Sequence, residues 1–304
     1  MRFGIDLGGT KIEIRALGEH GKELLCKRVP TPTQCYADVV AAIRDLVFDS
    51  ELQLGRRGSV GVAIPGSMSS MTGLVKNAPN IGLKGHPLDR DLAAALGRPV
   101  RIENDANCFT LSEARDGAAA GKNVVFGIIV GTGVGGGICV GGHILTGANH
   151  IAGEWGHTPL PAPCGEELTH PVLCKCGRSN CIESWCSGPG LAARFTVRTG
   201  RTLSVPEIVA EAKRGDREAA EEMEKFYDRF ARAIGTIVSI IDPDVVVIGG
   251  GLSNIDALYS ELPRRAQKHA ISPEGPIRVV KNRHGDSSGV RGAAWLWREE
   301  EVEE

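Results

Sequence analysis

Two pairs of predicted strands, each interrupted by glycines, constrain the fold of this chain most. Residues 2–17 (RFGIDLGGTKIEIRAL) predict strand, tight turn and strand, because two adjacent glycines separate two β-prone segments. Residues 125–140 (VFGIIVGTGVGGGICV) repeat the plan, and both segments begin around Phe-Gly-Ile. The period of this similarity is about half the chain. Such repetition indicates two related lobes, each beginning with a glycine hairpin.

The length and charge of the chain agree with two globular lobes. At about 100–200 residues per domain, 304 residues suggest two domains. Hydrophobic residues make up 42% and charged residues 24%, a balance typical of soluble globular proteins. The net charge of −2 gives no field that would attract nucleic acid or a membrane, so neither is an expected partner. We find no signal peptide and no apolar run that could span a bilayer, and therefore expect a cytoplasmic protein.

Between and after the two hairpins, the sequence pattern predicts helices and short buried strands. Helices are expected over residues 37–54 and 217–241, the second with Asp216 as N-cap. Short strands are expected over 60–64, 100–103 and 245–248. We expect an N-terminal lobe over 1–120, joined by a C-terminal helix over 288–304, and a C-terminal lobe over 121–287.

Three glycine clusters follow predicted strands and are candidate phosphate-binding turns. They are Gly8 with Gly9, residues 131–137, and residues 249–251. Glycine permits positive φ and close approach of the backbone to a ligand, and successive N–H groups can hold phosphate oxygens. Each cluster alone is also explained as a tight turn.

The middle cluster resembles a dinucleotide-binding motif in spacing only. Residues 131–136 contain G-x-G-x-x-G, but that motif requires a helix directly afterwards. Residues 138–140 continue as a strand, so we exclude the dinucleotide-binding fold. No GxxxxGK[ST] motif occurs, and Thr10 and Lys11 follow the first glycine pair on a hairpin.

Two aspartates at strand ends are candidates for the chemistry. Asp6 ends the first strand beside a glycine turn, where a carboxylate suits a hydrated Mg²⁺ bound with ATP phosphates. Asp105 lies between the strand ending at Glu103 and a helix through about Ala119. There it can accept the proton of an attacking hydroxyl, and Asn104 can hold a neighbouring hydroxyl. The alternatives are that Asp6 caps a turn and that Asp105 is a simple N-cap.

A cluster of cysteines predicts a metal site. Three of the nine cysteines, Cys174, Cys176 and Cys181, lie within eight positions. Cytosolic cysteines are rarely disulfide-bonded, and three thiolates with His157 suit a closed, structural, tetrahedral zinc site. Unligated reduced cysteines are the alternative.

The same segment offers other ligands and two carboxylates. Cys164 and His170 lie inside the loop and are alternative zinc ligands. Glu154 lies just before the cluster and Glu183 two residues after it. Zinc would hold residues 157–181 together as a zinc-binding segment, so both carboxylates could face one polyhydroxyl ligand.

Six motifs, in order and over nearly the whole chain, resemble the ROK family of repressors, open reading frames and kinases. They are DLGGTK at 6–11, ENDAN at 103–107, GTGVGGG at 131–137, GEWGH at 153–157, CKCGRSNCIE at 174–183 and DPDVVVIGGG at 242–251. The resemblance implies an actin-like ATPase (ribonuclease H-like) α/β fold of two lobes with an intervening cleft. It also implies phosphorylation of a hexose by ATP with Mg²⁺, and a homodimer.

The resemblance assigns roles to individual residues. Asp105 matches the catalytic base. Asn104, Glu154, His157 and Glu183 match sugar-contacting positions, and His157, Cys174, Cys176 and Cys181 match the zinc ligands. The nucleotide-binding positions are Gly4, Asp6, Gly8, Gly9, Thr10, Lys11, Gly131, Thr132, Gly133, Val134, Gly135, Gly136, Gly137, Gly249, Gly250 and Gly251. Asn180 stands where the family usually has glycine, and asparagine tolerates a left-handed backbone.

Two segments predict the sugar. GEWGHTPLP at 153–161 and HGDSSGVRGAAWLW at 284–297 look most like bacterial fructokinases that also accept mannose. This favours D-fructose phosphorylation at the 6-hydroxyl, with N-acetylglucosamine kinase or glucokinase as alternatives. A ROK repressor would need an N-terminal helix-turn-helix, for which residue 2 leaves no room. An inactive sugar-binding protein would not require the base Asp105.

Overall fold

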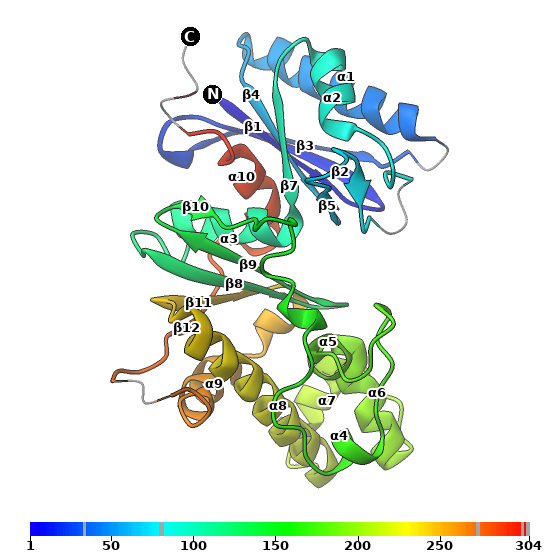
Figure 1. Cartoon of the computed structure of the whole chain (residues 1–304), viewed down its shortest axis with the longest axis vertical. Helices are drawn as coiled ribbons and strands as arrows, with labels where there is room; N and C mark the ends of the chain where they lie inside the picture. The colour runs from blue at the N-terminus through cyan, green and yellow to red at the C-terminus, as the bar shows by residue number, and fades with distance from the viewer. Residues whose placement is uncertain (33–34, 79–81, 272–273, 299–300, 302–304) are drawn as a thin grey trace. The chain divides into compact units, whose positions relative to one another are not determined.

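Both predicted glycine hairpins are confirmed in the computed structural model, which describes residues 1–32, 35–78, 82–271, 274–298 and 301. The first hairpin comprises β1 (Arg2–Leu7) and β2 (Lys11–Leu17). The second comprises β8 (Val124–Val130) and β9 (Val134–Val140). Each hairpin belongs to a five-stranded sheet, and the two sheets share one plan, with orders β3-β2-β1-β4-β7 and β10-β9-β8-β11-β12. The repeat seen in the sequence is therefore a repeat of sheet topology (Figure 1).

In the first sheet, three parallel strands end at one edge. Beside the hairpin lie β3 (Glu23–Pro30), which pairs antiparallel with β2, and β4 (Ser59–Ile64), which pairs parallel with β1. Next comes β7 (Val100–Asn104), parallel to β4. The carboxyl ends of parallel strands are where α/β sheets bind ligands, and Asp6 and Asn104 lie at two of these ends.

The two faces of the first sheet pack differently. On one face, alternate β1 residues such as Phe3 and Ile5 form a core with α1 (Tyr36–Leu54) and α2 (Leu88–Leu96). On the other face lie α3 (Asp105–Arg115) and α10 (Ser288–Ala294).

Glycines let α10 approach its neighbours closely. A Cβ on Gly4 would lie 1.9 Å from the Val290 carbonyl oxygen, and one on Gly292 only 1.6 Å from that of Cys108 in α3. Any side chain at these positions would force the elements apart.

The second sheet is built on the same scheme with shorter edges. Parallel to β8 runs β11 (Val245–Gly249), followed by the parallel β12 (Val279–Lys281). The antiparallel edge strand β10 (His143–Ile144) pairs with β9. Because β8 and β11 are parallel, the glycine clusters that follow them leave the sheet at the same edge.

Helices α4 to α9 follow the second hairpin in the chain. They are α4 (Glu166–Thr169), α5 (Ile182–Cys186), α6 (Gly188–Thr199), α7 (Val205–Lys213), α8 (Arg217–Ile241) and α9 (Leu258–Ala266). Helix α8 confirms the prediction for 217–241. The Asp216 side chain caps it by accepting a hydrogen bond from the backbone N–H of Ala219 at 2.8 Å.

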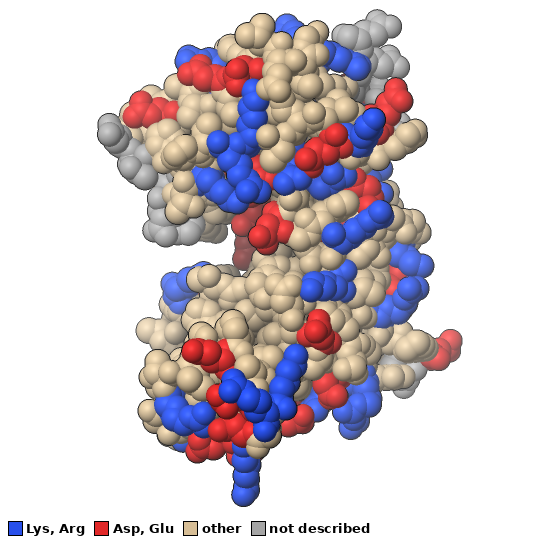
Figure 2. Space-filling model, turned by 180° about the vertical axis from the view of Figure 1, so that it is seen from behind, with Lys and Arg blue, Asp and Glu red and all other residues tan. Residues whose placement is uncertain are grey.

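The short elements complete the description. They are the paired strands β5 (Ser67–Met68) and β6 (Val75–Lys76), and the 3-10 turns η1 (Glu19–Gly21), η2 (Trp155–His157), η3 (Gly251–Asn254) and η4 (Gly285–Ser287). Among the described residues, no helix combines the length and apolar character needed to cross a bilayer. Figure 2 shows Lys and Arg side chains interspersed with Asp and Glu on the face in view.

The chain divides into two compact units that differ from the expected lobes. Unit 1 is Met1–Gly121, Gly137–Ala152 and Arg283–Glu304, and unit 2 is Lys122–Gly136 and Gly153–Asn282. Residues 137–152 belong to unit 1, because Gly137 packs against α3. We had expected these residues in the C-terminal lobe. The predicted helix over 288–304 is shorter, since α10 ends at Ala294, and residues 299–300 and 302–304 lie outside the described residues. Helix α3 likewise ends at Arg115 rather than near Ala119.

Candidate active site

Asn104, not Asp105, caps the helix that begins at the end of β7. The Asn104 side-chain oxygen accepts hydrogen bonds from the backbone N–H groups of Ala106 at 2.9 Å and Asn107 at 3.3 Å. Its Nδ2 donates to the Gly66 carbonyl oxygen at 3.0 Å. Asp105 is the first helical residue, and its Oδ1 accepts from its neighbour Ala106 at 2.8 Å. The capping role proposed as the alternative for Asp105 therefore belongs mainly to Asn104.

Asp6 and Asp105 influence each other electrostatically within unit 1. Burial, together with the negative charges of Asp105 and Glu13, raises the pKa of Asp6 to about 6. A carboxyl group with neighbouring negative charges and little water gains most from a bound cation. The strand ends thus bring together the two aspartates that the sequence singled out.

The first glycine turn is mostly exposed. Gly8 N–H donates to the Lys11 carbonyl oxygen at 3.0 Å, and Gly9, Thr10 and Lys11 are exposed. The Lys11 ammonium lies 3.6 Å from a carboxylate oxygen of Glu13, the residue opposite Asp6 in the β1–β2 pair. The turn is also held by the Thr31 hydroxyl, which donates to the Gly8 carbonyl oxygen at 2.7 Å. Sequence reasoning missed Thr31, since nothing local marks it.

The two glycine clusters of unit 2 meet. A Cβ built on Gly131 would lie 3.6 Å from the Gly251 nitrogen. Gly250 has φ +82°, and a Cβ there would lie 2.5 Å from the Val130 carbonyl oxygen, so only glycine fits. Gly188, at the start of α6, donates its N–H to the Gly131 carbonyl oxygen at 2.8 Å. The sequence analysis overlooked Gly188, although it begins a Gly-Pro-Gly helix start that could have been noticed.

Three predicted nucleotide-binding glycines are instead explained by packing. Gly4 is buried against α10. A Cβ on Gly136 would lie 2.6 Å from the Trp155 ring, and one on Gly137 would lie 2.5 Å from the Thr110 hydroxyl oxygen. All three are buried, so packing accounts for glycine at these positions, and their nucleotide contact stays a prediction.

Four predicted zinc ligands converge. Ligand atoms of His157, Cys174, Cys176 and Cys181 all lie within 4.8 Å of one another. The His157 Nδ1 to Cys174 Sγ distance is 3.5 Å, and the two remaining sulfurs are also 3.5 Å apart. Ligands at 2.0–2.3 Å in a tetrahedral site are roughly 3.3–3.8 Å apart. One imidazole and three sulfurs at this spacing fit structural zinc.

The alternative ligands lie outside this cluster. Cys164 is exposed, and its backbone N–H donates to the Glu167 carboxylate at 2.9 Å. His170 Nδ1 is 2.8 Å from the Thr169 hydroxyl. Hydrogen bonding from the Arg178 backbone N–H lowers the pKa of Cys176 to about 6, whereas burial raises the pKa of Cys181 to about 12.

Asn180 confirms the expected left-handed turn and adds contacts. Its φ is +58°. Its side-chain oxygen accepts from the Val172 N–H at 2.8 Å and from Trp185 Nε1 at 3.2 Å. Its Nδ2 donates to the Glu167 carbonyl oxygen at 2.9 Å. The asparagine therefore fastens the loop before the cluster to α5 after it.

The two predicted sugar-binding glutamates differ in environment. Glu154 is exposed and lies just before the turn η2. Glu183, in α5, is only 8% exposed. Its Oε2 accepts from the backbone N–H of Val134 at 3.0 Å, and its Oε1 lies 3.2 Å from the Lys175 ammonium. The Val134 N–H, a predicted phosphate donor, is thus already bound to a carboxylate.

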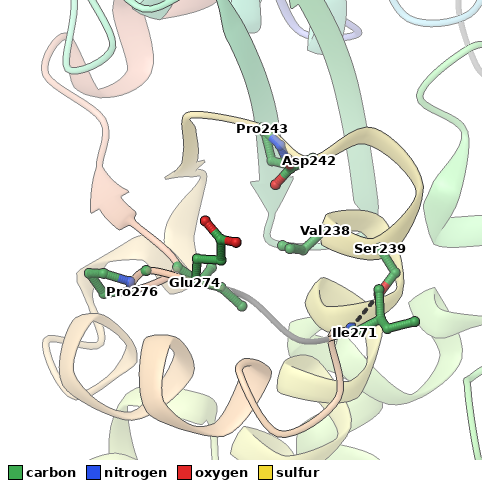
Figure 3. A pocket seen from close by; sticks show the side chains of 9 residues that line it. Val238, Ser239, Asp242, Pro243, Ile271, Glu274 and Pro276 are labelled. Carbon is green, nitrogen blue, oxygen red and sulfur yellow. Dashed lines mark hydrogen bonds between the residues drawn. The ribbon is translucent and has the colours of Figure 1, made fainter.

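A pocket of about 480 Å³ lies elsewhere in unit 2, at the end of α8 (Figure 3). Val238, Ser239, Asp242 and Ile271 are among its lining residues, and the Ile271 N–H donates to the Ser239 hydroxyl oxygen at 3.2 Å. None of the predicted site residues lines it. The pocket therefore supports no role in the predicted chemistry.

Comparison with known proteins agrees with the geometry. The model of the ROK family matches residues 2–300. An N-acetyl-D-glucosamine kinase of Yersinia pseudotuberculosis serotype O:1b (strain IP 31758) is 42% identical over 300 residues, 97% of this chain and 98% of the relative. One of Vibrio cholerae serotype O1 is 42% identical over 299 residues, 97% and 99% of the two chains.

Solved structures extend the likeness to three dimensions. The ROK hexokinase from Thermus thermophilus matches with a TM-score of 0.86 at 30% identity, covering 97% of this chain and 96% of that one. A ROK family glucokinase from Streptomyces griseus, solved in complex with glucose and AMPPNP, matches with a TM-score of 0.77 at 28% identity, covering 98% and 99%.

These matches confirm the predicted α/β fold of the actin-like ATPase class and correct one expectation. The preference for fructokinase as the nearest group is not supported, because relatives at 42% identity are N-acetyl-D-glucosamine kinases, which the sequence analysis gave as an alternative. The chain belongs to the ROK family, and its relatives group it with the family's sugar kinases.

Proposed function

We propose that this chain is an ATP-dependent hexose kinase that phosphorylates the 6-hydroxyl of N-acetylglucosamine. The observation that carries the chemistry is at the start of α3, where Asn104 caps the helix and the charge of Asp105 helps to raise the pKa of the partly buried Asp6. The sugar rests on the two relatives at 42% identity.

In the proposed reaction, Asp105 accepts the proton of the sugar hydroxyl. The hydroxyl oxygen forms a bond to the γ-phosphorus, and the bond from that phosphorus to the bridging oxygen of ADP breaks, with its electron pair leaving on ADP. A carboxylate base orients the nucleophile and removes its proton as charge moves to the leaving group. Mg²⁺, held with ATP by Asp6 through water, would neutralise charge on the phosphate oxygens.

The remaining site residues are assigned to binding. Sugar hydroxyls are bound by Asn104, Glu154, His157 and Glu183. The phosphates are bound by the backbone of three glycine segments, which are Gly8, Gly9, Thr10 and Lys11; Gly131, Thr132, Gly133 and Gly135; and Gly249, Gly250 and Gly251. The convergence of Gly131 and Gly251 supports this assignment, since adjacent glycine backbones present N–H groups to one anion.

Zinc, held by His157, Cys174, Cys176 and Cys181, would be structural. Four protein ligands leave no position for water, so no catalytic role is proposed for it. Assembly as a homodimer stays a prediction from the family resemblance.

Fructose, with mannose, is the second candidate substrate. It is favoured by two segments, 153–161 and 284–297, that look most like fructokinases. A coupled ADP-release assay across N-acetylglucosamine, fructose, mannose and glucose tests the proposal. We expect the highest kcat/KM with N-acetylglucosamine. A higher value with fructose would transfer the assignment to fructokinase, and no sugar-dependent ADP release would refute the kinase.

A further inference from the structure

The side chain of Glu183 lies directly beneath the glycine turn that joins β8 to β9. Its Oε2 accepts the Val134 N–H at 3.0 Å, and a Cβ built on Gly133 would lie 2.7 Å from the same oxygen. A side chain at residue 133 would therefore displace this carboxylate from its position under the turn. A role in sugar binding alone does not explain this contact between Glu183 and the glycine turn.

The other oxygen of this carboxylate faces the zinc-binding segment. Oε1 lies 3.2 Å from the Lys175 ammonium and 3.9 Å from Cys174 Sγ. The Lys175 side chain is 70% exposed, whereas that of Glu183 is 11% exposed, so the pair is anchored at the glutamate. One buried carboxylate thus touches both the segment that carries the zinc ligands and the glycine turn.

The glycine turn is fixed at two points by one short stretch of chain. Glu183 holds it at Val134, and Gly188 holds it at Gly131, whose carbonyl oxygen accepts the Gly188 N–H at 2.8 Å. Glu183 lies in α5, and Ser187, the residue after α5, donates its N–H to the Glu183 carbonyl oxygen at 3.1 Å. Helix α5 begins directly after Cys181. The position of the turn is therefore set from the end of the zinc-binding segment.

We propose that Glu183 is a positioning residue for nucleotide binding, in that its bond to the Val134 N–H fixes the glycine turn in the conformation that receives the phosphates. The inference rests on the proposed function, which assigns this turn to the nucleotide. Charge-assisted hydrogen bonds to backbone N–H groups are among the stronger ones in proteins. Loss of this bond leaves the turn free to relax and lowers its affinity for phosphate.

The test measures Mg²⁺–ADP binding by calorimetry in the absence of sugar, so that a sugar-binding role cannot contribute. We expect Glu183→Ala to weaken ADP binding about tenfold, the effect of one such hydrogen bond. Glu183→Gln keeps an acceptor for the Val134 N–H and should lose about threefold or less. Lys175→Ala, the matched control, loses the ion pair but keeps the Val134 contact, and should bind ADP like the wild type.

A double-mutant cycle with Gly133→Ala makes the test independent of folding defects in one variant. The backbone of Gly133 does not have a positive φ in the structure, so alanine is opposed there by Glu183 Oε2 rather than by its own backbone. Gly133→Ala should weaken ADP binding more in the wild type than in the Glu183→Ala background, because Glu183→Ala removes the carboxylate that would clash with the new β-carbon. Zinc content, measured by elemental analysis, confirms that each variant keeps the cluster.

Wild-type ADP affinity in zinc-loaded Glu183→Ala, or fully additive effects in the cycle, would overturn the proposal. A loss of sugar affinity with unchanged ADP affinity would return Glu183 to a purely sugar-binding role. Failure of the wild-type chain to bind ADP at all would instead refute the proposed function, so the two failures are distinguishable.

Discussion

The two glycine turns occupy equivalent places in two sheets of the same strand order, yet they are supported differently. The turn between β1 and β2 is held by the Thr31 hydroxyl, and its residues 9–11 are exposed. The turn between β8 and β9 is held by Glu183 and by Gly188. One topology thus serves two tasks. The first hairpin carries the charged Lys11 and the carboxyl group of Asp6, and the second has a turn whose backbone is fixed by hydrogen bonds (the braced side).

The largest expected effect concerns Asp105, on the charged side of this comparison. Asp105→Asn removes the proton acceptor but keeps the shape of the side chain, so kcat should fall by about 10²–10⁴-fold while sugar affinity changes little. Steady-state kinetics and calorimetric sugar binding measure the two quantities. Asp45→Asn, at an exposed position of α1, is the matched control. Near-normal turnover in Asp105→Asn would show that another group is the base.

Breaking the zinc cluster should destabilise the braced side. Elemental analysis should find about one zinc per chain in the wild type. Cys176→Ser should lose it and lower the free energy of unfolding by about 4 kcal/mol or more, as losses of structural metals do.

Cys164→Ser is the control for the zinc experiment, because Cys164 lies in the same segment but outside the cluster. It should keep both zinc and stability. A wild-type protein without zinc, or a Cys176→Ser variant as stable as the wild type, would contradict a structural metal here.

We expect the ionised Asp6 carboxylate to lower the stability of the nucleotide-free protein while it contributes to the proposed Mg²⁺ binding. Burial raises its pKa from 3.8 to about 6, so the folded state holds this proton to higher pH than the unfolded chain. The free energy of unfolding therefore falls as pH rises from about 4 to 6, and the penalty remains at higher pH. Asp6→Asn removes the charge and should stabilise the nucleotide-free protein by up to about 3 kcal/mol at pH 7.5, and not at pH 3.5.

Urea denaturation at both pH values measures this gain, and kinase assays of the same variant should show reduced activity, because Asp6 is proposed to hold Mg²⁺. The Asp45→Asn protein again serves as control. If Asp6→Asn were no more stable than wild type at pH 7.5, ionisation of Asp6 would not destabilise the folded state, and the prediction would be wrong.

The smallest expected effect is at Asn180. Asn180→Gly keeps the left-handed backbone but loses three hydrogen bonds, and should cost about 1 kcal/mol of stability. Asn180→Ala adds the cost of a β-carbon at positive φ, about 1 kcal/mol more. Thermal unfolding of zinc-loaded protein compares the two. Equal stability of both variants would show that the backbone angle contributes nothing.

Local patterns in the sequence predicted the elements well. The helix over 217–241 was set by apolar residues at helical spacing and by the capping Asp216, both of which are local. The hairpins were marked by adjacent glycines. The four predicted zinc ligands were marked by cysteine spacing and a nearby histidine, and their side chains converge as expected.

Tertiary neighbours could not be predicted in the same way. We predicted nucleotide contacts for Gly4 and Gly137 from the sequence. The structure explains glycine at Gly4 by the close approach of α10, and at Gly137 by the close approach of α3. Neither helix is a sequence neighbour of the glycine that it contacts. The capping of α3 was ambiguous because Asn104 and Asp105 are both good N-cap residues, and only the backbone angles decide between them. The contact of Glu183 with Val134 joins residues 49 positions apart and leaves no local trace.

The packing of α10 also constrains how the chain is made. The sheet of unit 1 begins with residue 2, yet the helix that covers Gly4 is formed by residues 288–294. Residues 288–294 are synthesised long after residue 4, so the part of the sheet face that α10 covers stays uncovered until they have left the ribosome. Such exposed apolar surface is open to aggregation or chaperone binding in the interval. A chain truncated before Ser288 should therefore be a poor folder even though its proposed catalytic residues are all present.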